Sequence, residues 1–192
     1  MKGTFIFFAD GFEEVEAIAT LDILRRGGVD VKSVSIYDNS LVEGAHGQQL
    51  ITDLCWEDLE EIISTEASPS DYMRFPGGMP GAKTLAEFGP LMALLKAHWA
   101  AGGGVAAICA SPAVVLASLG DTFAGLEMTC YDGFEATLQA AGIKHKEAGS
   151  VVDGRLVTGR GPGYATEFAL SILAQIKDRD TAAAVSAGFT PR

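Results

Sequence analysis

The chain has 192 residues, of which 48% are hydrophobic, and it carries a formal net charge of −11 at pH 7. This length suits a single domain, residues 1–192, with a sizeable core. The negative charge has no basic run to offset it, which argues against nucleic acid and anionic membranes as partners. No apolar run approaches the roughly 20 residues that a membrane span needs.

The first residues and the cysteines together indicate a cytoplasmic protein. Residues 1–9 look superficially like a signal peptide, but their apolar part is short and acidic side chains follow at once, so we expect a first strand there. Three cysteines without metal-site spacing favour free thiols in a reducing compartment. None of the three histidines is near a cysteine in sequence, so we expect neither a metal nor a cofactor.

Predicted strands and helices alternate along the chain. In the first half we expect strands at residues 2–9, 31–36 and 72–75, helices at 13–26 and 56–63, and a small hairpin at 41–42 and 49–51. In the second half we expect helices at 91–101, 113–119 and 166–177, and strands at 105–108, 127–129, 145–147, 150–152 and 156–158. Residues 178–192 are expected to form either a short helix or a frayed tail. This alternation predicts an α/β fold with a doubly wound, mostly parallel sheet and helices on both faces.

Cys109 is the most informative residue of the sequence. It follows the apolar run 105–108 and precedes a predicted helix that has Pro112 near its first turn. A sharp turn from strand to helix points a side chain out of the sheet, and the positive end of a helix dipole favours thiolate over thiol. The sequence therefore predicts a cysteine placed for reactivity.

Four predicted loops follow strands at what should be the same edge of the sheet. They are residues 10–13, 76–81, 109–112 and 159–163. In doubly wound sheets, ligands bind at the carboxyl ends of the strands, near the point where strand order reverses. These loops contain glutamate, glycines, the cysteine and an arginine, and this combination predicts a site.

Three glutamates open the first predicted helix. Negative side chains stabilise a helix start, which accounts for Glu13 and Glu14. Glu16 lies beside Ile23 and near Ala19 on the helical wheel, so it is the one that can be partly buried with a raised pKa. A protonated glutamic acid beside a thiolate can donate a hydrogen bond to it. Helical pitch alone does not decide among the three.

Two glycine-rich turns lie among the four loops. Glycines after a strand expose backbone N–H groups, and those of Gly78 and Ala110 can together hold an oxyanion. The same turn also fits an ordinary connection from strand to helix. In the second turn, Arg160 can bind a carboxylate or orient nearby backbone, but we favour a structural arginine tied to a C-terminal carbonyl.

No histidine falls in the four loops. His98 lies within a predicted helix and His145 begins an outer strand, so we expect both at the surface. His46 lies in the hairpin turn and stays open as a partner for the cysteine. The candidate pocket-lining residues are Gly77, Tyr131, Arg160, Gly161, Pro162 and His46.

Residues 11–16, 76–78, 106–112 and 160–169, taken in this order and spacing, resemble the motifs of the ThiJ/PfpI superfamily. Within it, they are most similar to the Parkinson-disease-associated protein deglycase branch. The resemblance covers nearly the whole chain and implies a flavodoxin-like sandwich and a homodimer, with the hairpin around His46 near the dimer partner. It also implies that Cys109 is a nucleophile-elbow cysteine, that Glu16 is the protonated glutamate at its sulfur, and that Gly78 and Ala110 are backbone donors.

The resemblance implies a glutathione-independent glyoxalase or deglycase that acts on small 2-oxoaldehydes or their protein adducts. One alternative is a non-enzymatic oxidative-stress sensor or chaperone that works through oxidation of Cys109. Another is a hydrolase like the family's intracellular proteases, or a member labelled for thiazole biosynthesis. Ala110 stands where the peptidase branch has a histidine, which argues against proteolysis. Tyr131 and His46 stand where some deglycase-branch members have histidine and arginine.

Overall fold

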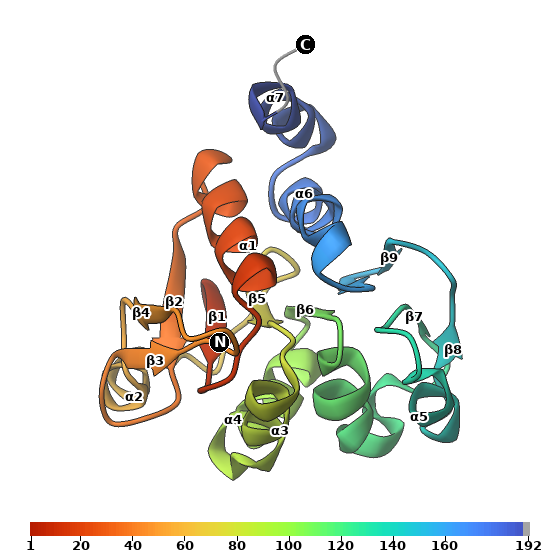
Figure 1. The fold of residues 1–192 in the computed structure, drawn as a ribbon, viewed down its shortest axis with the longest axis horizontal. Coiled ribbons are helices and arrows are strands. Elements are labelled where there is room, and N and C mark those ends of the chain that lie inside the picture. The colour runs from red at the N-terminus through yellow and green to blue at the C-terminus, as the bar shows by residue number, and fades with distance from the viewer. Residues whose placement is uncertain (190–192) are drawn as a thin grey trace.

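The computed structural model describes residues 1–189, which form a six-stranded sheet between two helical layers (Figure 1). The strand order is β2–β1–β5–β6–β10–β9, and every neighbouring pair is parallel except β9 with β10. The strands are β1 (Thr4–Phe8), β2 (Val31–Ser35), β5 (Tyr72–Phe75), β6 (Gly104–Ile108), β9 (Ser150–Asp153) and β10 (Leu156–Gly159). The predicted doubly wound, mostly parallel sheet is confirmed.

Helices cover both faces of this sheet, as Figure 1 shows. One face carries α1 (Glu14–Arg26) and α6 (Ala165–Ile176), with α7 (Arg179–Phe189) packed outside α6. The other face carries α2 (Trp56–Ile62), α3 (Met79–Glu87), α4 (Gly89–Ala100), η1 (Pro112–Leu116), η2 (Ala117–Phe123) and α5 (Glu135–Ala140). The helix expected near the C-terminus is confirmed as α7, and residues 190–192 of that prediction lie outside the described part of the chain.

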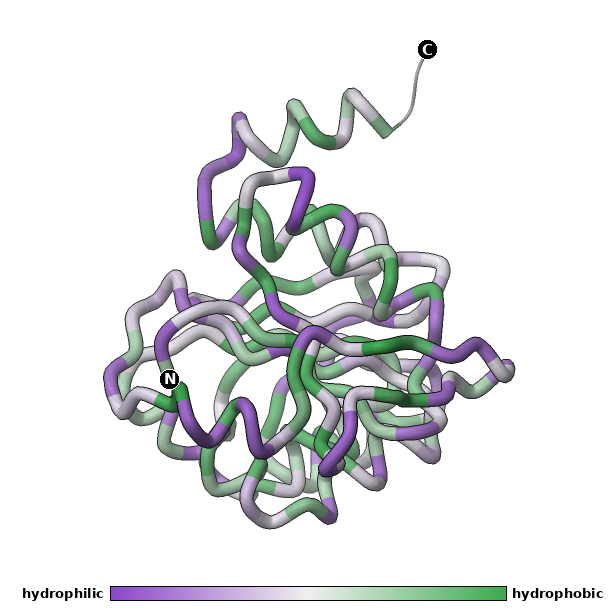
Figure 2. The backbone as a smooth tube through the Cα atoms, turned by 90° about the vertical axis from the view of Figure 1, so that its left-hand side faces the viewer, coloured by the Kyte–Doolittle hydropathy of each residue, from purple (hydrophilic) through white to green (hydrophobic). Residues whose placement is uncertain are grey.

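The central strands are apolar because they are buried on both faces. In β1, Phe5 and Phe7 belong to one hydrophobic cluster, whereas Ile6 and Phe8 belong to the other. Alternate side chains of a strand point to opposite faces, so a continuous apolar run serves both cores. Figure 2 shows this pattern as hydrophobic tube in the interior and hydrophilic tube mainly at turns and along exposed helix faces.

Two short sheets lie outside the main one. The predicted hairpin is confirmed as β3 (Leu41–Glu43) and β4 (Gln49–Ile51), which pair antiparallel, and β7 (Glu127–Met128) pairs with β8 (Lys144–His145). The hairpin segment lies against the loop that leads into α1. There, the Gly11 N–H donates to the Glu43 carbonyl at 2.7 Å, and the Ala45 N–H donates to the Phe12 carbonyl at 2.8 Å.

Three helical segments differ from the sequence prediction. Residues 76–81 were expected to be a loop, but α3 begins at Met79, with Pro80 in its first turn, where its missing N–H costs nothing. Helix α5 was not predicted. Residues 113–119 do not form a regular α-helix: they begin in the π-helical turn η1 and continue into the 3-10 segment η2. Such π turns recur at functional sites. No helix within residues 1–189 is long and apolar enough to cross a membrane.

Candidate functional site

The candidate site lies where the strand order reverses, between β1 and β5. The chain leaves β1 toward β2 on one side of the sheet, whereas β5, β6 and β10 follow on the other side. Three segments meet at the carboxyl ends of these strands: the start of α1, the turn after β5 and the residue that ends β6. Open parallel sheets bind ligands at such a switch point.

Cys109 follows β6 directly and has a backbone φ of 64°. It is the only non-glycine residue with a positive φ among residues 1–189. This left-handed conformation costs a non-glycine residue about 1–2 kcal/mol. Two hydrogen bonds hold it: the Cys109 N–H donates to the Gly159 carbonyl, and the Tyr131 N–H donates to the Cys109 carbonyl, both at 2.9 Å. Local strain maintained in this way is typical of functional positions.

Glu16 is completely buried in the first turns of α1. Its Oε2 accepts a hydrogen bond from the Gly77 N–H at 2.7 Å, whereas its Oε1 has no hydrogen-bond partner within residues 1–189. The other two glutamates have different roles. The Glu13 side chain caps the helix by accepting from the Glu16 N–H at 2.7 Å, and Glu14 binds His46. The tertiary structure thus selects Glu16 from the three.

Gly77 fills the space between the two side chains. A Cβ atom on Gly77 would come within 2.5 Å of both the Cys109 Cβ and the Glu16 Oε2, and within 3.0 Å of the Cys109 Sγ. Its carbonyl also accepts from the Glu13 N–H at 2.9 Å. Gly77 is therefore the residue that lets the carboxyl and the thiol approach each other.

The two ionisable groups perturb each other. Burial raises the pKa of Glu16 to about 7, although the Gly77 N–H opposes this shift. Burial and the neighbouring Glu16 carboxyl raise the pKa of the Cys109 thiol to about 12, and the N–H groups of Ala110 and Gly78 lower it only partly. The sequence led us to expect that the start of the helix favours thiolate over thiol, but burial and the neighbouring Glu16 carboxyl shift the pKa of the thiol in the opposite direction.

The two turns around the sulfur are held in place by backbone geometry. Gly78 has a φ of 90°, and a Cβ atom there would collide with the Gly11 carbonyl oxygen, so this turn requires glycine. The buried Ser111 hydroxyl donates to the Pro76 carbonyl at 2.5 Å and ties the turn after β6 to the turn after β5. The N–H groups of Gly78 and Ala110 are thereby kept beside the sulfur.

Four of the predicted pocket-lining residues line one small cavity. Tyr131, Arg160, Gly161 and Pro162 surround it together with Asp132, Gly163 and Tyr164, and its volume is about 170 Å³. Cys109 does not line this cavity, but the N–H of Tyr131 in its wall donates to the Cys109 carbonyl at 2.9 Å. Arg160 pairs with the Asp132 carboxylate at 2.7 Å, and not with the C-terminal carbonyl that the sequence analysis favoured.

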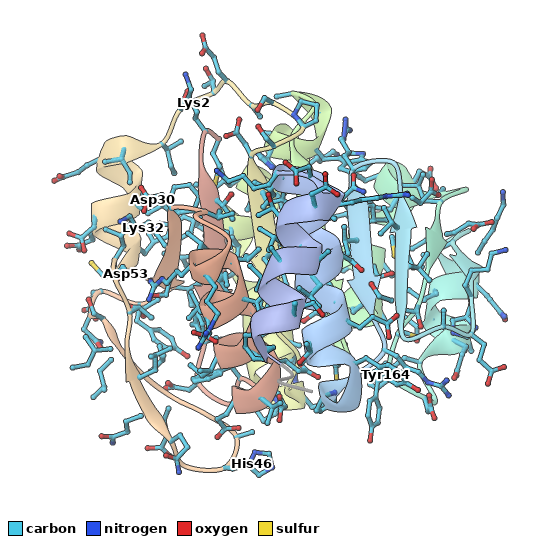
Figure 3. The ribbon with its side chains drawn as sticks, turned by 90° about the horizontal axis from the view of Figure 1, so that it is seen from above. Lys2, Asp30, Lys32, His46, Asp53 and Tyr164 are labelled. Atoms are coloured by element: carbon cyan, nitrogen blue, oxygen red, sulfur yellow. The ribbon has the colours of Figure 1, made fainter. Side chains whose placement is uncertain are left out.

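His46 lies apart from Cys109 on the hairpin segment. Its Nδ1 is 2.7 Å from the Glu14 Oε2, and this contact raises the pKa of the His46 imidazole. In Figure 3, His46 and Tyr164 project from the same end of the molecule, opposite Lys2. Glu13, Glu14 and His46 bring ligand atoms within 4.8 Å of one another, an arrangement that could hold a metal ion. Capping and ion pairing already account for these three side chains.

The prediction that His98 is a surface residue is wrong. Its side chain is buried at 1% exposure, its Nδ1 lies 2.9 Å from the Met1 amino group, and its Nε2 lies 2.9 Å from the Gly104 carbonyl. It anchors the start of the chain at the edge of the sheet opposite Cys109. His145 is half-buried in β8.

The sequence analysis also missed a buried arginine beneath the site. Arg74 lies in β5 with no exposed surface, and its Nη2 donates to the Glu16 carbonyl oxygen. The available signal was a lone cationic residue inside an otherwise apolar strand.

Comparison with known proteins identifies the family of this chain. The model of the DJ-1/PfpI family matches residues 2–175. The chain belongs to this family. Toxoplasma gondii DJ-1, solved in an oxidised form, superposes with a TM-score of 0.88 at 32% identity, over 98% of each chain. The resemblance inferred from the four motifs is confirmed, and the solved structure supports the same α/β fold.

Curated relatives show the breadth of the DJ-1/PfpI family. The chain is 34% identical over its full length to Arabidopsis thaliana Protein DJ-1 homolog B. It is also 34% identical to the Caenorhabditis elegans Glutathione-independent glyoxalase DJR-1.2, over 84% of this chain and 81% of that protein. The chain spans less than half the length of the two Arabidopsis homologues that it matches, 42% and 45%.

Proposed function

We propose that this DJ-1/PfpI family member is a glutathione-independent glyoxalase that converts small 2-oxoaldehydes, free or as protein adducts, into 2-hydroxy acids. The observation that carries the proposal is the buried Glu16 carboxyl, which lies beside Cys109 with one oxygen, Oε1, unpartnered within residues 1–189. The relative named as a glyoxalase supports the same activity.

The first step forms a bond between Cys109 and the substrate aldehyde. With a thiol pKa of about 12, the sulfur needs a base to reach the thiolate at neutral pH, and Glu16 is the carboxyl in contact with it. The thiol proton passes to Glu16, and the thiolate attacks the aldehyde carbon. The resulting alkoxide takes the proton back from Glu16, which yields a neutral hemithioacetal and a free carboxylate. The N–H groups of Gly78 and Ala110 stabilise negative charge during this exchange.

The second step moves hydrogen between the two substrate carbons. The Glu16 carboxylate removes the proton from the former aldehyde carbon, and the electron pair forms an enediolate whose negative charge lies on the neighbouring oxygen. Glu16 then returns the proton to the neighbouring carbon, and the hydroxyl proton of the first carbon moves to the oxygen of the second, so the first carbon is oxidised and the second is reduced within one molecule. The product is a thioester of Cys109. Water hydrolyses the thioester, releases the 2-hydroxy acid and restores the thiol, so the net reaction consumes one water.

We assign the cavity lined by Tyr131, Arg160, Gly161 and Pro162 to the part of the substrate that does not react. Tyr131 in its wall is bonded to the Cys109 backbone. The cavity combines two partly exposed tyrosine rings with a guanidinium that keeps donors beyond its bond to Asp132. A volume of about 170 Å³ leaves room for a substituent larger than a methyl group. His46 has no role in these steps. A homodimer and a cytoplasmic location stay predictions.

Turnover of methylglyoxal tests the proposal. Wild-type protein, freshly reduced and without glutathione, is expected to form lactate, and Cys109→Ser is expected to form none above background. Cys55→Ser is the matched control, because Cys55 has the same 9% exposure as Cys109 and also lies at the start of a helix, α2. Absence of lactate from wild type, or an active Cys109→Ser protein, would contradict the proposed function.

A second candidate function is a sensor of oxidative stress. Cys109 retains 9% exposure, and the N–H groups of Gly78 and Ala110 that lie beside its sulfur can bind the oxygens of a sulfinate. Cys130 is buried at 1% exposure.

Mild peroxide treatment followed by intact-mass analysis and peptide mapping tests this second function. We expect a gain of two oxygen atoms confined to Cys109. Oxidation spread over all three cysteines would count against a dedicated sensor.

A further inference from the structure

Arg74 is buried beneath the Cys109–Glu16 pair. Arg74 lies in β5, paired with Ile6 of β1 and Ala106 of β6 in the middle of the sheet. Its side chain has no exposed surface, and its guanidinium lies 5.5 Å from the centre of the Phe168 ring of α6. An arginine at the centre of a parallel sheet is costly, because its charge is removed from water.

The hydrogen bonds of Arg74 do not offset this cost. Nη2 donates to the Glu16 carbonyl oxygen, but Nε and Nη1 have no hydrogen-bond partner within residues 1–189. The described ion pairs do not include Arg74, so no carboxylate lies within 4 Å of its guanidinium nitrogens in that part of the chain. A buried donor without a partner costs about 1–3 kcal/mol. Packing alone therefore gives no reason for an arginine here.

The charged groups around Arg74 explain why a buried arginine stands at this position. Glu16 and Glu13, both at the start of α1, are the carboxylates that act on its guanidinium, and the α6 side chain that packs on it is the uncharged Phe168. Burial lowers the pKa of Arg74 to about 9, so the group stays positive at neutral pH. Glu16 in turn faces Glu13, Cys109 and the Gly77 N–H, and Arg74 is the cation among the groups that act on it.

We propose that Arg74 is a positioning residue of the site, a buried cation that holds the backbone of Glu16 and stabilises the carboxylate form of its side chain next to Cys109. Without that charge, Glu16 would face a buried environment, Glu13 and the thiol, all of which favour its protonated form. The consequence for turnover rests on the proposed function. The electrostatic effect of Arg74 on the Glu16 carboxylate does not depend on which reaction the protein catalyses.

The test compares two neutral variants with a matched control. Arg74→Met keeps much of the side-chain length and removes both charge and donors, whereas Arg74→Gln removes the charge and keeps a donor for the Glu16 carbonyl. Arg155→Met is the control, because Arg155 also donates to a carbonyl, stacks on an aromatic ring (Trp99, 3.7 Å) and has an unpartnered Nε within residues 1–189, but it is not among the groups that act on Glu16.

The primary readout is the titration of the Glu16 side chain by NMR with ¹³C-labelled glutamate, its signal assigned by its loss in Glu16→Gln. The wild-type midpoint is expected near pH 7. Both Arg74 variants are expected to move it upward by about one unit or more, and Arg155→Met is expected to leave it in place.

Each outcome of the NMR titration decides the matter, and none of them requires glyoxalase activity. An unchanged midpoint in both folded variants overturns the proposal. A shift in Arg74→Met that Arg74→Gln does not share also overturns it, because a hydrogen bond and not the charge would then be responsible. If Arg74→Met does not fold, Arg74→Gln carries the test alone. Failure of wild type to form lactate would leave the titration result standing.

Discussion

Glu16→Gln is expected to abolish turnover of methylglyoxal while Cys109 stays reactive. The amide keeps the shape of the side chain but cannot carry a proton between the two substrate carbons, so kcat should fall at least about 100-fold. The variant also removes the negative charge and the hydrogen bond that raise the pKa of the thiol. Alkylation of Cys109 by iodoacetamide at pH 8, where solvent hydroxide can take the thiol proton in place of Glu16, should therefore persist in the variant, as measured by mass spectrometry.

The same substitution should change how stability depends on pH. The folded-state pKa of Glu16, about 7, lies above the reference value of 4.5, so the folded protein binds this proton more tightly than the unfolded chain does. Its contribution to stability is therefore present below pH 4.5 and is lost as pH rises to about 7, by about 3 kcal/mol. In urea unfolding across this range, Glu16→Gln should lack that loss and should be the more stable protein at pH 8.

Glu14→Gln is the matched control for Glu16→Gln. Glu14 lies in the same turn of α1, but its carboxylate binds His46 instead of approaching Cys109. Its turnover should stay within about twofold of wild type, because the bond to His46 is at the surface. A Glu16→Gln protein with the wild-type rate would refute the proton-transfer mechanism. Loss of alkylation together with turnover would show that Glu16 serves the thiol alone.

Gly77→Ala is expected to separate the two reactive side chains. The new methyl group would lie 2.5 Å from both the Cys109 Cβ and the Glu16 Oε2, closer than carbon and oxygen atoms pack. Both neighbours are side-chain atoms in a buried, closely packed site, so the Cys109 or the Glu16 side chain must shift. A displacement of about 1 Å costs on the order of 100-fold in rate, and overpacking costs about 1–3 kcal/mol of stability. Steady-state kinetics and thermal unfolding measure the two effects.

Gly89→Ala is the control for an added methyl group. Gly89 opens α4, has an ordinary backbone conformation and has no atom within 4 Å of the position that a Cβ would take. Its rate and Tm should match those of wild type or improve slightly, because alanine favours a helix. A Gly77→Ala protein with normal kinetics would mean that the distance between Cys109 and Glu16 does not limit the reaction.

The main features of the site could be predicted because they are local. A short apolar run followed by small residues and a proline marks the turn that presents Cys109, and helical pitch makes Glu16 a candidate for the inner face of α1. Local backbone geometry is enough to place such residues, because their positions depend on neighbours in the sequence and not on distant parts of the chain. The position of a strand end within a parallel sheet then brings the loops to one edge.

Other features depend on atoms that are distant in sequence. Glycine fits position 77 because β5 and β6 are neighbours, and that pairing leaves no space for a Cβ between Glu16 and Cys109. His98 is buried because the start of the chain folds against it. The thiol pKa depends on burial and on a carboxylate from another element, neither of which a local pattern contains.

The sequence by itself determined the alternation of strands and helices, the family and the choice of Cys109 as the candidate reactive cysteine, since each follows from short-range pattern and spacing. Only the tertiary structure decided which of three glutamates reaches that cysteine, that burial and this carboxyl raise the pKa of the thiol, and that a cation lies beneath Glu16. These properties arise from desolvation and from charges brought together by the sheet. Desolvation and charge interactions act through space over a few ångströms, here between residues that lie about 60 to 90 positions apart in the sequence.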